Sequence, residues 1–423
     1  MSSTIQSKKR NNKNDNLHKA KSAKNDEFYT QLTDVSKELM HYKKHFKDKI
    51  VFCNCDDPTW SAFWKYFHLN FEELGLKKLI STHYDKEEAT YKMEYEGGND
   101  NDIEVGIKTP LKGNGDFRDE ECLELLDECD IVVTNPMFSL FREYVSALIE
   151  HNKKFIILGN PNAVTYKEFF PLLKENRVWV GAKPWSQEMY FRVPKEREEW
   201  LVKNKKEGSA YVIKDGQILG RVATIWYTNL DISKRHEKLI LWKKYTPEEY
   251  PKYDNYDAIN VNKVSEIPCD YCESWGIYQA EFDALDKTQW EEVRREPIND
   301  TELIYVIPAK DTELRQALHE HTYGYKEKIE HVLAKSIYCS GCMGVPITYL
   351  DKHNPKQFDI IGCSSSWMIA GIEGSMPSNS FMELVNKGKV RTGGTPGKSK
   401  PCWIDNQGYA NVGYHRIFLR KKI

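Results

Sequence analysis

The sequence predicts an α/β fold built on a largely parallel sheet. Apolar runs at residues 50–53, 131–133 and 155–158 each stop close to a polar residue and a proline. Aromatic and aliphatic residues recur at helical spacing after the first two runs. Strand, polar loop and helix in alternation are typical of parallel sheets that are covered by helices.

The composition sets limits on this fold. The 423 residues are enough for two domains, or for one domain with a large insertion. A formal net charge of -2 gives no global basicity that would indicate nucleic acid. We find no apolar run that could span a bilayer and no signal peptide, so we expect a cytoplasmic protein without a membrane partner. The ten cysteines then suggest reduced thiols or metal ligands.

The N-terminal segment, residues 1–24, is basic, lacks an apolar period and is predicted to be a disordered tail. It suits either a phosphate-seeking arm or a solubilising end. A helical pattern follows and runs to Tyr42, ahead of the strand at residues 50–53. Asp56 and Asp57 come soon after that strand, where acids commonly face a ligand; the alternative is that they cap the next helix.

A second strand is predicted at residues 79–85, and it ends on Asp85. In nucleoside-binding α/β folds an acid at this point can hold ribose hydroxyls, and the alternative is an ordinary surface residue. The polar stretch that follows predicts a hairpin. The alternation at residues 103–108 predicts a half-exposed strand.

A tight turn at residues 113–117 contains an acid and an aromatic residue. Asp116 could accept a hydrogen bond from the amine of a purine ring, and Phe117 could stack on that ring. The alternative is that Asp116 satisfies backbone donors at the start of a helix, which the apolar pattern predicts over residues 122–129.

The turn after residues 131–133 carries the most specific chemistry. Asn135 supplies an amide oxygen, Pro136 a backbone carbonyl and Phe138 an aromatic face. Together they can clamp a flat heterocycle through its exocyclic amine, which then loses conjugation with the ring and becomes a better nucleophile. The alternative is an ordinary turn, since Asn-Pro is common in turns. With the acids at other strand ends, the clamp favours methyl transfer from S-adenosylmethionine to an amine.

Seven segments follow the order of one family from about residue 25 onward. They are Asp26-Glu-Phe-Tyr-Thr30, Cys53-Asn-Cys-Asp-Asp-Pro58, Gly115-Asp-Phe-Arg118, Asp130-Ile-Val-Val-Thr-Asn-Pro136, Phe138-Ser-Leu-Phe-Arg142, Trp226-Tyr-Thr-Asn-Leu-Asp231 and Met343-Gly-Val-Pro-Ile-Thr348. By these segments the chain resembles the EcoRI-type adenine-specific DNA methyltransferases.

The resemblance implies N6-methylation of adenine at a short sequence in double-stranded DNA, commonly beside a restriction enzyme. It implies a Rossmann-like S-adenosylmethionine-dependent methyltransferase sheet over residues 25–235 and a target-recognition region over residues 236–423. It assigns Asn135, Pro136 and Phe138 to the catalytic loop, and the target adenine must be flipped out of the duplex to reach it. The cofactor pocket implied by the resemblance is lined by Tyr29, Thr30, Asn54, Asp56, Asp57, Asp85, Asp116 and Phe117.

The chain departs from the usual motif in one position. The family's loop usually has a second proline, where this chain has Met137. The acceptor atoms of Asn135 and Pro136 survive this change, but a fixed φ is lost, so reduced activity or a differently held base is expected. The first loop, residues 57–61, also lacks the glycines of most S-adenosylmethionine sites, as it does in this family.

The second half departs from the family by an insert of about seventy residues, approximately 269–342. We expect a small accessory subdomain there that widens the recognition surface, or a contact for a partner protein. Strands are predicted at residues 275–279 and 303–307, and a helix at 312–334. A Cys-x-x-Cys pair stands at each neck, which favours a structural zinc site, with four reduced cysteines as the alternative. The four residues are Cys269, Cys272, Cys339 and Cys342.

Two other segments suit contact with DNA. Residues 243–267 are rich in Tyr, Lys and Asn, as a DNA-facing surface or a solvated loop would be. The basic, glycine-rich residues 386–400 suit phosphate contacts or a disordered loop. Two other functions remain open: an amine methyltransferase that acts on protein or a free nucleobase, and a non-catalytic DNA-binding decoy. The oligomeric state is open as well, with a monomer as one alternative.

Overall fold

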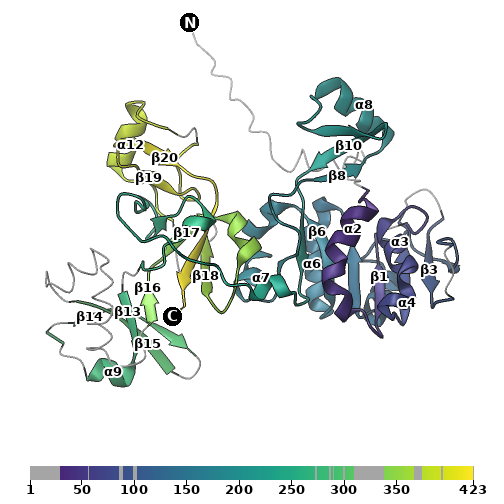
Figure 1. The fold of residues 1–423 in the computed structure, drawn as a ribbon, viewed down its shortest axis with the longest axis horizontal. Coiled ribbons are helices and arrows are strands. Elements are labelled where there is room, and N and C mark those ends of the chain that lie inside the picture. Colours follow the sequence, from purple (N-terminus) through teal and green to yellow (C-terminus); the bar gives the residue numbers. More distant parts are fainter. Residues whose placement is uncertain are drawn as a thin grey trace, which may run out of the picture. The chain divides into compact units, whose positions relative to one another are not determined.

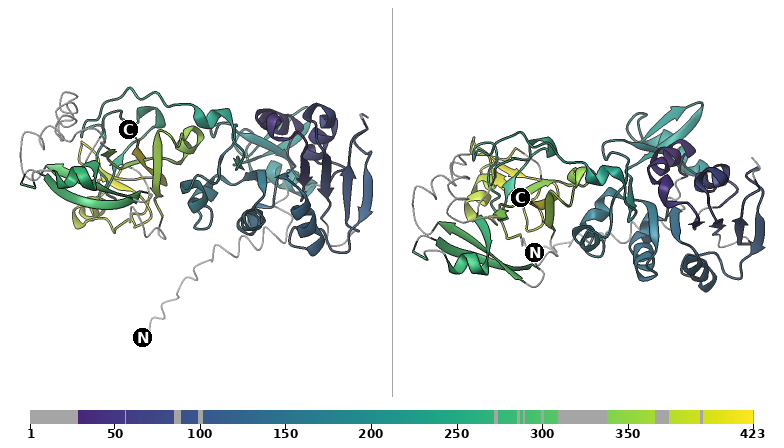
Figure 2. Two further views of the ribbon diagram at one scale, coloured as in Figure 1. Left: turned by 90° about the horizontal axis from the view of Figure 1, so that it is seen from below. Right: turned by 60° about the horizontal axis from the view of Figure 1, so that its bottom comes forward.

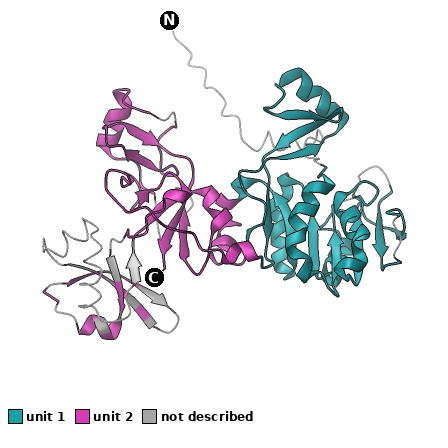
Figure 3. Ribbon diagram, viewed as in Figure 1, with its two compact units in different colours: residues 1–163, 178–232 teal, residues 164–177, 233–423 magenta. Residues whose placement is uncertain are grey.

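The computed structural model describes residues 29–422 except 56, 85–88, 99–101, 272–273, 285–286, 289, 299–300, 309–337, 366–373 and 392–393. The predicted tail at residues 1–24 and the predicted helix at 312–334 lie outside the described residues. The chain divides into two compact units (Figure 3). Unit 1 comprises Met1–Ala163 and Val178–Ile232, and unit 2 comprises Val164–Arg177 and Ser233–Ile423. Within the described ranges we find no helix that is long and apolar enough to cross a bilayer.

Unit 1 is organised around an eight-stranded mixed sheet (Figure 1). Its strands are β1 (Ile50–Cys53), β2 (Lys78–Thr82), β3 (Tyr91–Tyr95), β4 (Ile107–Pro110), β5 (Ile131–Thr134), β6 (Lys154–Gly159), β7 (Trp179–Val180) and β11 (Ile225–Thr228). The strand order is β4-β3-β2-β1-β5-β6-β11-β7. The central strands β2, β1, β5 and β6 are parallel, and the outer strands pair in antiparallel fashion. The four parallel strands therefore end at one edge of the sheet.

Helices lie on both faces of this sheet (Figure 2). One face is covered by α2 (Leu32–Leu39), η1 (Met40–His45), α3 (Ala62–Leu69) and α4 (Phe71–Leu74). The other face is covered by α5 (Glu120–Glu128) and α6 (Phe141–Glu150). The mixed α/β class that the sequence predicts is confirmed in this form.

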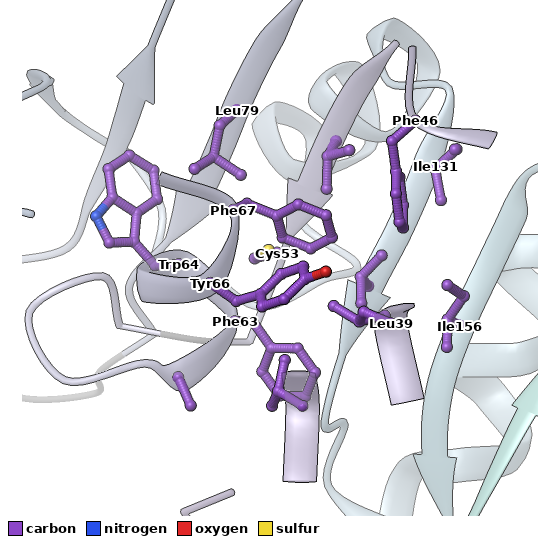
Figure 4. Close-up of a cluster of buried hydrophobic side chains, with 14 of the residues drawn as sticks. Leu39, Phe46, Cys53, Phe63, Trp64, Tyr66, Phe67, Leu79, Ile131 and Ile156 are labelled. Carbon is purple, nitrogen blue, oxygen red and sulfur yellow. The ribbon is translucent and has the colours of Figure 1, made fainter. Parts of the chain in front are cut away.

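Aromatic side chains fill the space between α3 and the sheet. Phe63 and Phe67 project from α3 toward the strands, and Phe67 meets the edge of Phe46 with ring centroids 5.0 Å apart (Figure 4). Cys53 and Ile131 belong to the same buried cluster. Removing one such aromatic ring from water contributes roughly 1.5–3 kcal/mol, so this cluster anchors the strands whose ends carry the polar residues.

A small three-stranded sheet with the order β8-β10-β9 also belongs to unit 1. It consists of β8 (Met189–Arg192), β9 (Tyr211–Lys214) and β10 (Gln217–Val222), and α8 (Lys195–Asn204) packs on it. The two sheets follow closely along the chain, since β10 ends at Val222 in the small sheet and β11 begins at Ile225 in the large one.

Unit 2 contains two further small sheets and short helices. A four-stranded sheet has the order β12-β17-β21-β18, and a two-stranded sheet consists of β19 and β20. The strands are β12 (Ile259–Asn260), β17 (Met343–Pro346), β18 (Phe358–Cys363), β19 (Cys402–Ile404), β20 (Ala410–Val412) and β21 (Arg416–Lys421). The helices are α7 (Phe170–Lys174), η4 (Ser233–His236), η5 (Val264–Glu266), η6 (Ile347–Lys352) and α12 (Asn379–Asn386).

The inserted residues contribute another sheet to unit 2, with the order β14-β15-β13-β16. Its elements are β13 (Ser274–Tyr278), α9 (Gln279–Asp283), β14 (Trp290–Ile298), β15 (Thr301–Pro308) and β16 (Tyr338–Ser340). The two strands predicted in the insert coincide with β13 and β15.

Two sequence predictions need correction. The strand expected at 103–108 begins only at Ile107. In the polar stretch before it, β3 pairs in antiparallel fashion with β2 and β4, so the hairpin predicted there is confirmed. The segment 243–267 is not mainly a DNA-facing surface, because its tyrosines and Asn255 are buried. Tyr253 and Tyr256 pack against Phe418 in a core cluster of unit 2. Aromatic composition alone did not distinguish a core from a surface.

Candidate active site

Polar residues gather at the edge of unit 1 where β1, β2 and β5 end. The segments that meet there are 54–55, 57–61, 82–84, 113–118 and 135–141, and we name them the polar edge. The residues of the three strands are almost all buried, so the polar residues that follow each strand emerge at the sheet edge. All of these segments belong to unit 1.

Asp57 is the hub of the first segment, and its side chain is only 12% exposed. Its carboxylate accepts hydrogen bonds from the Thr59 amide at 2.9 Å and the Thr59 hydroxyl at 2.7 Å. It also accepts from the Tyr91 hydroxyl at 2.8 Å, and His83 Nδ1 lies 3.1 Å away. Burial and the bond to Asp57 raise the pKa of Tyr91 above its ordinary value, so this hydroxyl remains a donor.

These contacts remove the capping alternative for Asp57. The N-cap of α3 is Ser61, whose hydroxyl accepts from the Phe63 amide at 3.1 Å and the Trp64 amide at 3.2 Å. Asp57 instead joins the ends of three strands, since His83 follows β2 and Tyr91 begins β3. A carboxylate held in this way is oriented before any ligand arrives.

Cys55 supplies the backbone turn that glycine supplies in other loops of this kind. Its φ is 63°, in the left-handed region that L residues rarely adopt. A residue with a Cβ pays roughly 1–2 kcal/mol for that conformation. The backbone at Cys55 therefore turns as it would at a glycine.

Asn54 ties the end of β1 to the end of β5. The residue is buried; its carbonyl accepts from the Thr134 hydroxyl, and its side-chain oxygen accepts from the Tyr144 hydroxyl on α6. Asn135 directly follows Thr134, so the hydrogen bond to Asn54 fixes the point at which the Asn-Pro turn begins.

Gly115 allows the third segment to approach the end of β2. A Cβ at this position would lie 2.3 Å from the His83 carbonyl oxygen, and the φ of Gly115 is +74°. Phe117 is buried two residues later and meets the ring of Tyr144 edge-on, with centroids 5.0 Å apart. Phe117 and Asn54 therefore contact the same side chain, and the two segments converge.

Asp116 is held by an arginine that the sequence interpretation did not single out. Arg118 donates from Nε and Nη2 to the two carboxylate oxygens, at 2.8 and 2.7 Å. Its Nη1 reaches Glu143 on α6 at 2.8 Å. Hydrogen bonds to Asp116 raise the pKa of Arg118 above its ordinary value, so the guanidinium stays charged.

The Asn-Pro turn is compact. Pro136 is buried, Asn135 and Phe138 are half-buried, and Phe138 packs against the core cluster. The Leu140 amide donates to the Met137 carbonyl at 3.0 Å, which opens the short helix η2 (Phe138–Leu140). The φ of Met137 is -58°, within the range of a proline, so the residue adopts the conformation that the usual second proline would impose.

The first described residues of the chain return to the polar edge. Tyr29 exchanges backbone hydrogen bonds with Arg192, at 2.9 and 3.1 Å. Its ring lies 4.5 Å from that of Trp60, in the loop that contains Asp57. The Thr30 hydroxyl oxygen is buried and has no partner among the described residues, and the same holds for Ser139 and Thr82. Such hydroxyls suit contact with a polar ligand.

The structure thus brings together Tyr29, Asn54, Asp57, Asp116, Phe117 and Asn135 through a chain of contacts. Asp56 and Asp85 lie outside the described residues. Sequence reasoning missed His83, Tyr91 and Arg118, although the position of His83 directly after β2 was a usable signal. Sequence reasoning also missed Tyr144 on α6, whose hydroxyl bonds to Asn54.

The four insert cysteines are only partly described. Cys269 and Cys342 are half-buried, and no cluster of three potential metal ligands occurs among the described residues. Cys272 and the side chain of Cys339 lie outside them. Antiparallel pairing of Ser274 with Ser340 brings the two necks of the insert side by side. The zinc site therefore stays a prediction.

The chain is also similar in sequence to known proteins of one family. A family model described as adenine-specific methyltransferase EcoRI matches residues 16–339 and 321–422. The type II methyltransferase M.EcoRI of Escherichia coli is 46% identical over 285 residues, which cover 63% of this chain and 85% of the relative.

Two relatives from other bacteria also match. M.MgeORF184P of Mycoplasma genitalium, a type II methyltransferase, is 33% identical over 380 residues, which cover 89% of this chain and 93% of the relative. M.MpnI of Mycoplasma pneumoniae, also a type II methyltransferase, is 38% identical over 278 residues, covering 65% and 84%. No solved structure matches the chain significantly.

Proposed function

Because the chain belongs to the family of EcoRI-type adenine-specific methyltransferases, and is therefore an enzyme that methylates adenine in DNA, we propose that methyl transfer takes place at the polar edge of unit 1. One observation carries this assignment. Asn135 and Pro136 follow a central parallel strand, and the Thr134 hydroxyl bonds that strand end to Asn54 at the end of the neighbouring strand.

S-adenosylmethionine, when bound, supplies a methyl group on a positively charged sulfur that needs no further activation. The residues present fit this donor. The carboxylates of Asp57 and Asp116 can accept from its amines and hydroxyls, Phe117 offers an aromatic ring, and the buried Thr30 hydroxyl requires a polar partner. The residues that we assign to the donor are Tyr29, Thr30, Asn54, Asp56, Asp57, Asp85, Asp116 and Phe117.

The target is the amino group of an adenine that has left the duplex. Asn135 Oδ1 and the Pro136 carbonyl accept its two N–H groups, and Phe138 stacks on the ring. The nitrogen lone pair, withdrawn from conjugation, forms the new N–C bond as the donor's S–C bond breaks. The nitrogen then releases one proton to water, which leaves N6-methyladenine. Positioning and hydrogen-bond acceptance are the contribution of this chain to the rate.

Arg118 has a positioning role toward Asp116 in this scheme. Its bidentate contact fixes the plane of the carboxylate. Because Asp116 Oδ1 also accepts from the Arg118 backbone amide at 3.0 Å, Oδ2 is the oxygen that a ligand amine would approach.

The finer architecture is part of the same proposal. The sheet of unit 1 is Rossmann-like, residues 25–235 are catalytic, and residues 236–423 recognise the target sequence in duplex DNA. The insert, about 269–342, is an accessory subdomain of that recognition region. The names of the relatives as type II methyltransferases support a role in restriction-modification.

A structural zinc at the necks of the insert is the least supported part of the proposal. It rests on the spacing of the four cysteines and on the pairing of Ser274 with Ser340. Metal analysis of the purified full chain decides it. Four titratable thiols and no zinc would remove the metal.

The chain offers a matched pair of variants for the catalytic assignment. Asn-Pro also follows β6, at Asn160 and Pro161, where the Asn160 side-chain oxygen accepts from the Asn162 amide at 2.8 Å as an ordinary turn residue. We expect Asn135→Ala to lower methylation at least roughly hundredfold, because one of two acceptors is lost. Asn160→Ala should retain near wild-type activity.

The measurement uses the full-length protein, genomic DNA free of adenine methylation, and mass spectrometry of the digested nucleosides. Single-molecule sequencing of the same DNA gives the recognition sequence. Undiminished N6-methyladenine with Asn135→Ala would overturn the catalytic assignment, as would an equal loss with Asn160→Ala. No methylation by folded wild-type protein would overturn the activity itself.

A further inference from the structure

A buried asparagine in unit 2 gathers loops that are distant in sequence. Asn255 is 2% exposed. Its side-chain amide faces the carbonyl oxygens of Lys400 at 2.9 Å, Gly397 at 3.3 Å and Ser375 at 3.4 Å. Its side-chain oxygen accepts from the Cys402 amide at 2.8 Å. We name this set of contacts the Asn255 junction.

The neighbouring tyrosine strengthens the junction. The Tyr256 hydroxyl donates to the Lys398 carbonyl at 2.6 Å. A Cβ on Gly374 would lie 2.2 Å from that same carbonyl oxygen and 2.5 Å from the Tyr256 hydroxyl. The segments 374–378 and 394–401 are therefore packed against each other without room for a side chain at this point. The basic stretch that could have been a disordered loop is held in place from residue 394 to residue 401.

A third segment joins through the backbone. The Gly413 amide donates to the Pro401 carbonyl at 2.8 Å. The residue after Gly413 is Tyr414, and the residue after Ser375 is Met376. Tyr414 is 89% exposed and Met376 is 59% exposed, although both are large and apolar. The junction thus presents an aromatic and a flexible apolar side chain beside the basic loop.

The lysines of the basic loop differ from their neighbours in pairing. Lys387 bonds to Glu383 at 3.4 Å, and Arg391 bonds to Asp405 at 3.1 Å. Lys398 and Lys400 make no ion pair with any carboxylate in the part of the chain that is described. Lys398 is exposed and Lys400 half-buried, and the junction fixes the backbone of both. Their charges are thus available to an external anion.

We propose that the three segments at the Asn255 junction, 374–378, 394–401 and 413–415, form a preformed contact surface for the DNA backbone. Lys398 and Lys400 neutralise phosphates, while Tyr414 packs on a sugar or base. Asn255 acts as the positioning residue that holds the loops together. This inference rests on the proposed function, since it names the surface through which the recognition region meets its substrate.

Two physical arguments favour DNA as the occupant. Two cations without carboxylate partners attract phosphates, and a backbone that is fixed beforehand lowers the entropy lost on binding. An exposed aromatic ring next to such cations is the combination with which proteins hold nucleic acid through charge and stacking together. The exposed methionine suits close contact with a groove wall.

The test measures binding of the full-length protein to a short fluorescent DNA duplex of mixed sequence between about 50 and 200 mM KCl. Each phosphate contact contributes about 0.9 to the slope of log affinity against log salt. The double variant Lys398→Ala and Lys400→Ala should lower that slope by about 1.8 and weaken binding roughly tenfold. Lys387→Ala, which removes an exposed but paired lysine, is the matched control and should bind as the wild type does.

Tyr414→Ala should weaken binding several-fold with an unchanged salt slope, because the lost contact is uncharged. The variants alter side chains that are exposed or, at Lys400, half-buried, so we expect the fold to be retained, and thermal unfolding verifies this. A wild-type slope and affinity in the double lysine variant would overturn the proposal. The same preparations are tested for methylation of genomic DNA. If the wild-type protein methylates DNA and the variants bind DNA as it does, only the proposal for the Asn255 junction is rejected. If the folded wild-type protein does not methylate DNA, the proposed function is rejected.

Discussion

Two buried asparagines, one in each unit, do similar work in different settings. Asn54 in unit 1 joins the ends of two neighbouring parallel strands to a helix. Asn255 in unit 2 joins two loops by facing three of their backbone carbonyls. Because strand ends follow from local apolar patterns, the surroundings of Asn54 can be anticipated from sequence. The partners of Asn255 carry no local pattern and become visible only in three dimensions.

The comparison also separates two kinds of polar residue. At the polar edge, polar side chains hold one another in positions from which they can contact a ligand. At the Asn255 junction, polar side chains hold loops in position, and the ligand-facing groups are the exposed residues nearby. A buried polar residue in unit 2 is therefore a guide to the surface beside it.

The largest expected effects come from replacing each of the two asparagines, because each replacement should lower the affinity for a different ligand. Asn54→Ala leaves the buried Tyr144 hydroxyl without its acceptor, which costs about 1–3 kcal/mol and loosens the polar edge. Asn255→Ala frees three carbonyls and loosens the DNA-facing loops. We expect Asn54→Ala to lose most S-adenosylmethionine binding while retaining DNA binding, and Asn255→Ala to show the reverse. Calorimetry with the donor and fluorescence anisotropy with duplex DNA measure the two affinities.

If both variants lost both affinities together, the two regions would not be functionally separate. Thermal unfolding of each variant distinguishes that result from general instability. The wild-type chain and Asn160→Ala serve as references for the two assays.

An intermediate effect is expected at two glycines that lie against carbonyl oxygens. Gly115→Ala combines a strained φ with a clash at the His83 carbonyl, which should destabilise the protein by roughly 2–4 kcal/mol and weaken donor binding. Gly374→Ala clashes with the Lys398 carbonyl and should destabilise it by about 1–3 kcal/mol and weaken DNA binding instead. Denaturant titration gives both free energies of unfolding.

Gly208→Ala is the control for strain without a clash. Its φ is +80° and nothing lies within 4 Å of the added Cβ. We expect a loss of only about 1–2 kcal/mol and no change in either affinity. If Gly115→Ala lost no more stability than Gly208→Ala, the close approach of Gly115 to the His83 carbonyl would not contribute to stability.

The smallest expected effect comes from a change at Met137 in the Asn-Pro turn. Since Met137 already has the φ of a proline, Met137→Pro should raise the free energy of unfolding by about 0.5–1 kcal/mol, through restriction of the unfolded chain. Methylation should be equal to or faster than that of the wild type. A clear loss of activity would show that the methionine side chain or its amide has a role of its own.

The sequence was sufficient for much of unit 1. Residues 50–53 and 155–158 formed the expected strands because continuous apolar runs of this length suit a buried parallel sheet. The grouping of Asp57 with Asn135 followed from that sheet. The hydrogen bond from Tyr91 to Asp57 could not be anticipated, because the hairpin predicted in that polar stretch did not specify which side chain would face the end of β1.

Unit 2 was less predictable for a physical reason. Tyr253 and Tyr256 have the composition of a binding surface, yet they are buried by Phe418 from the far end of the chain. Burial between segments that are more than a hundred residues apart depends on topology, which a local pattern does not specify. The order in the basic loop likewise comes from Asn255, at a distance of 145 residues from Lys400.

Arg118 has a thermodynamic consequence for the order in which ligands bind. It spans Asp116, on the loop assigned to the donor, and Glu143, on the helix that starts directly after the catalytic turn. Under the proposed assignment, if donor binding changes the affinity of the turn for the target base through this arginine, then binding of the base changes the affinity for the donor by the same factor.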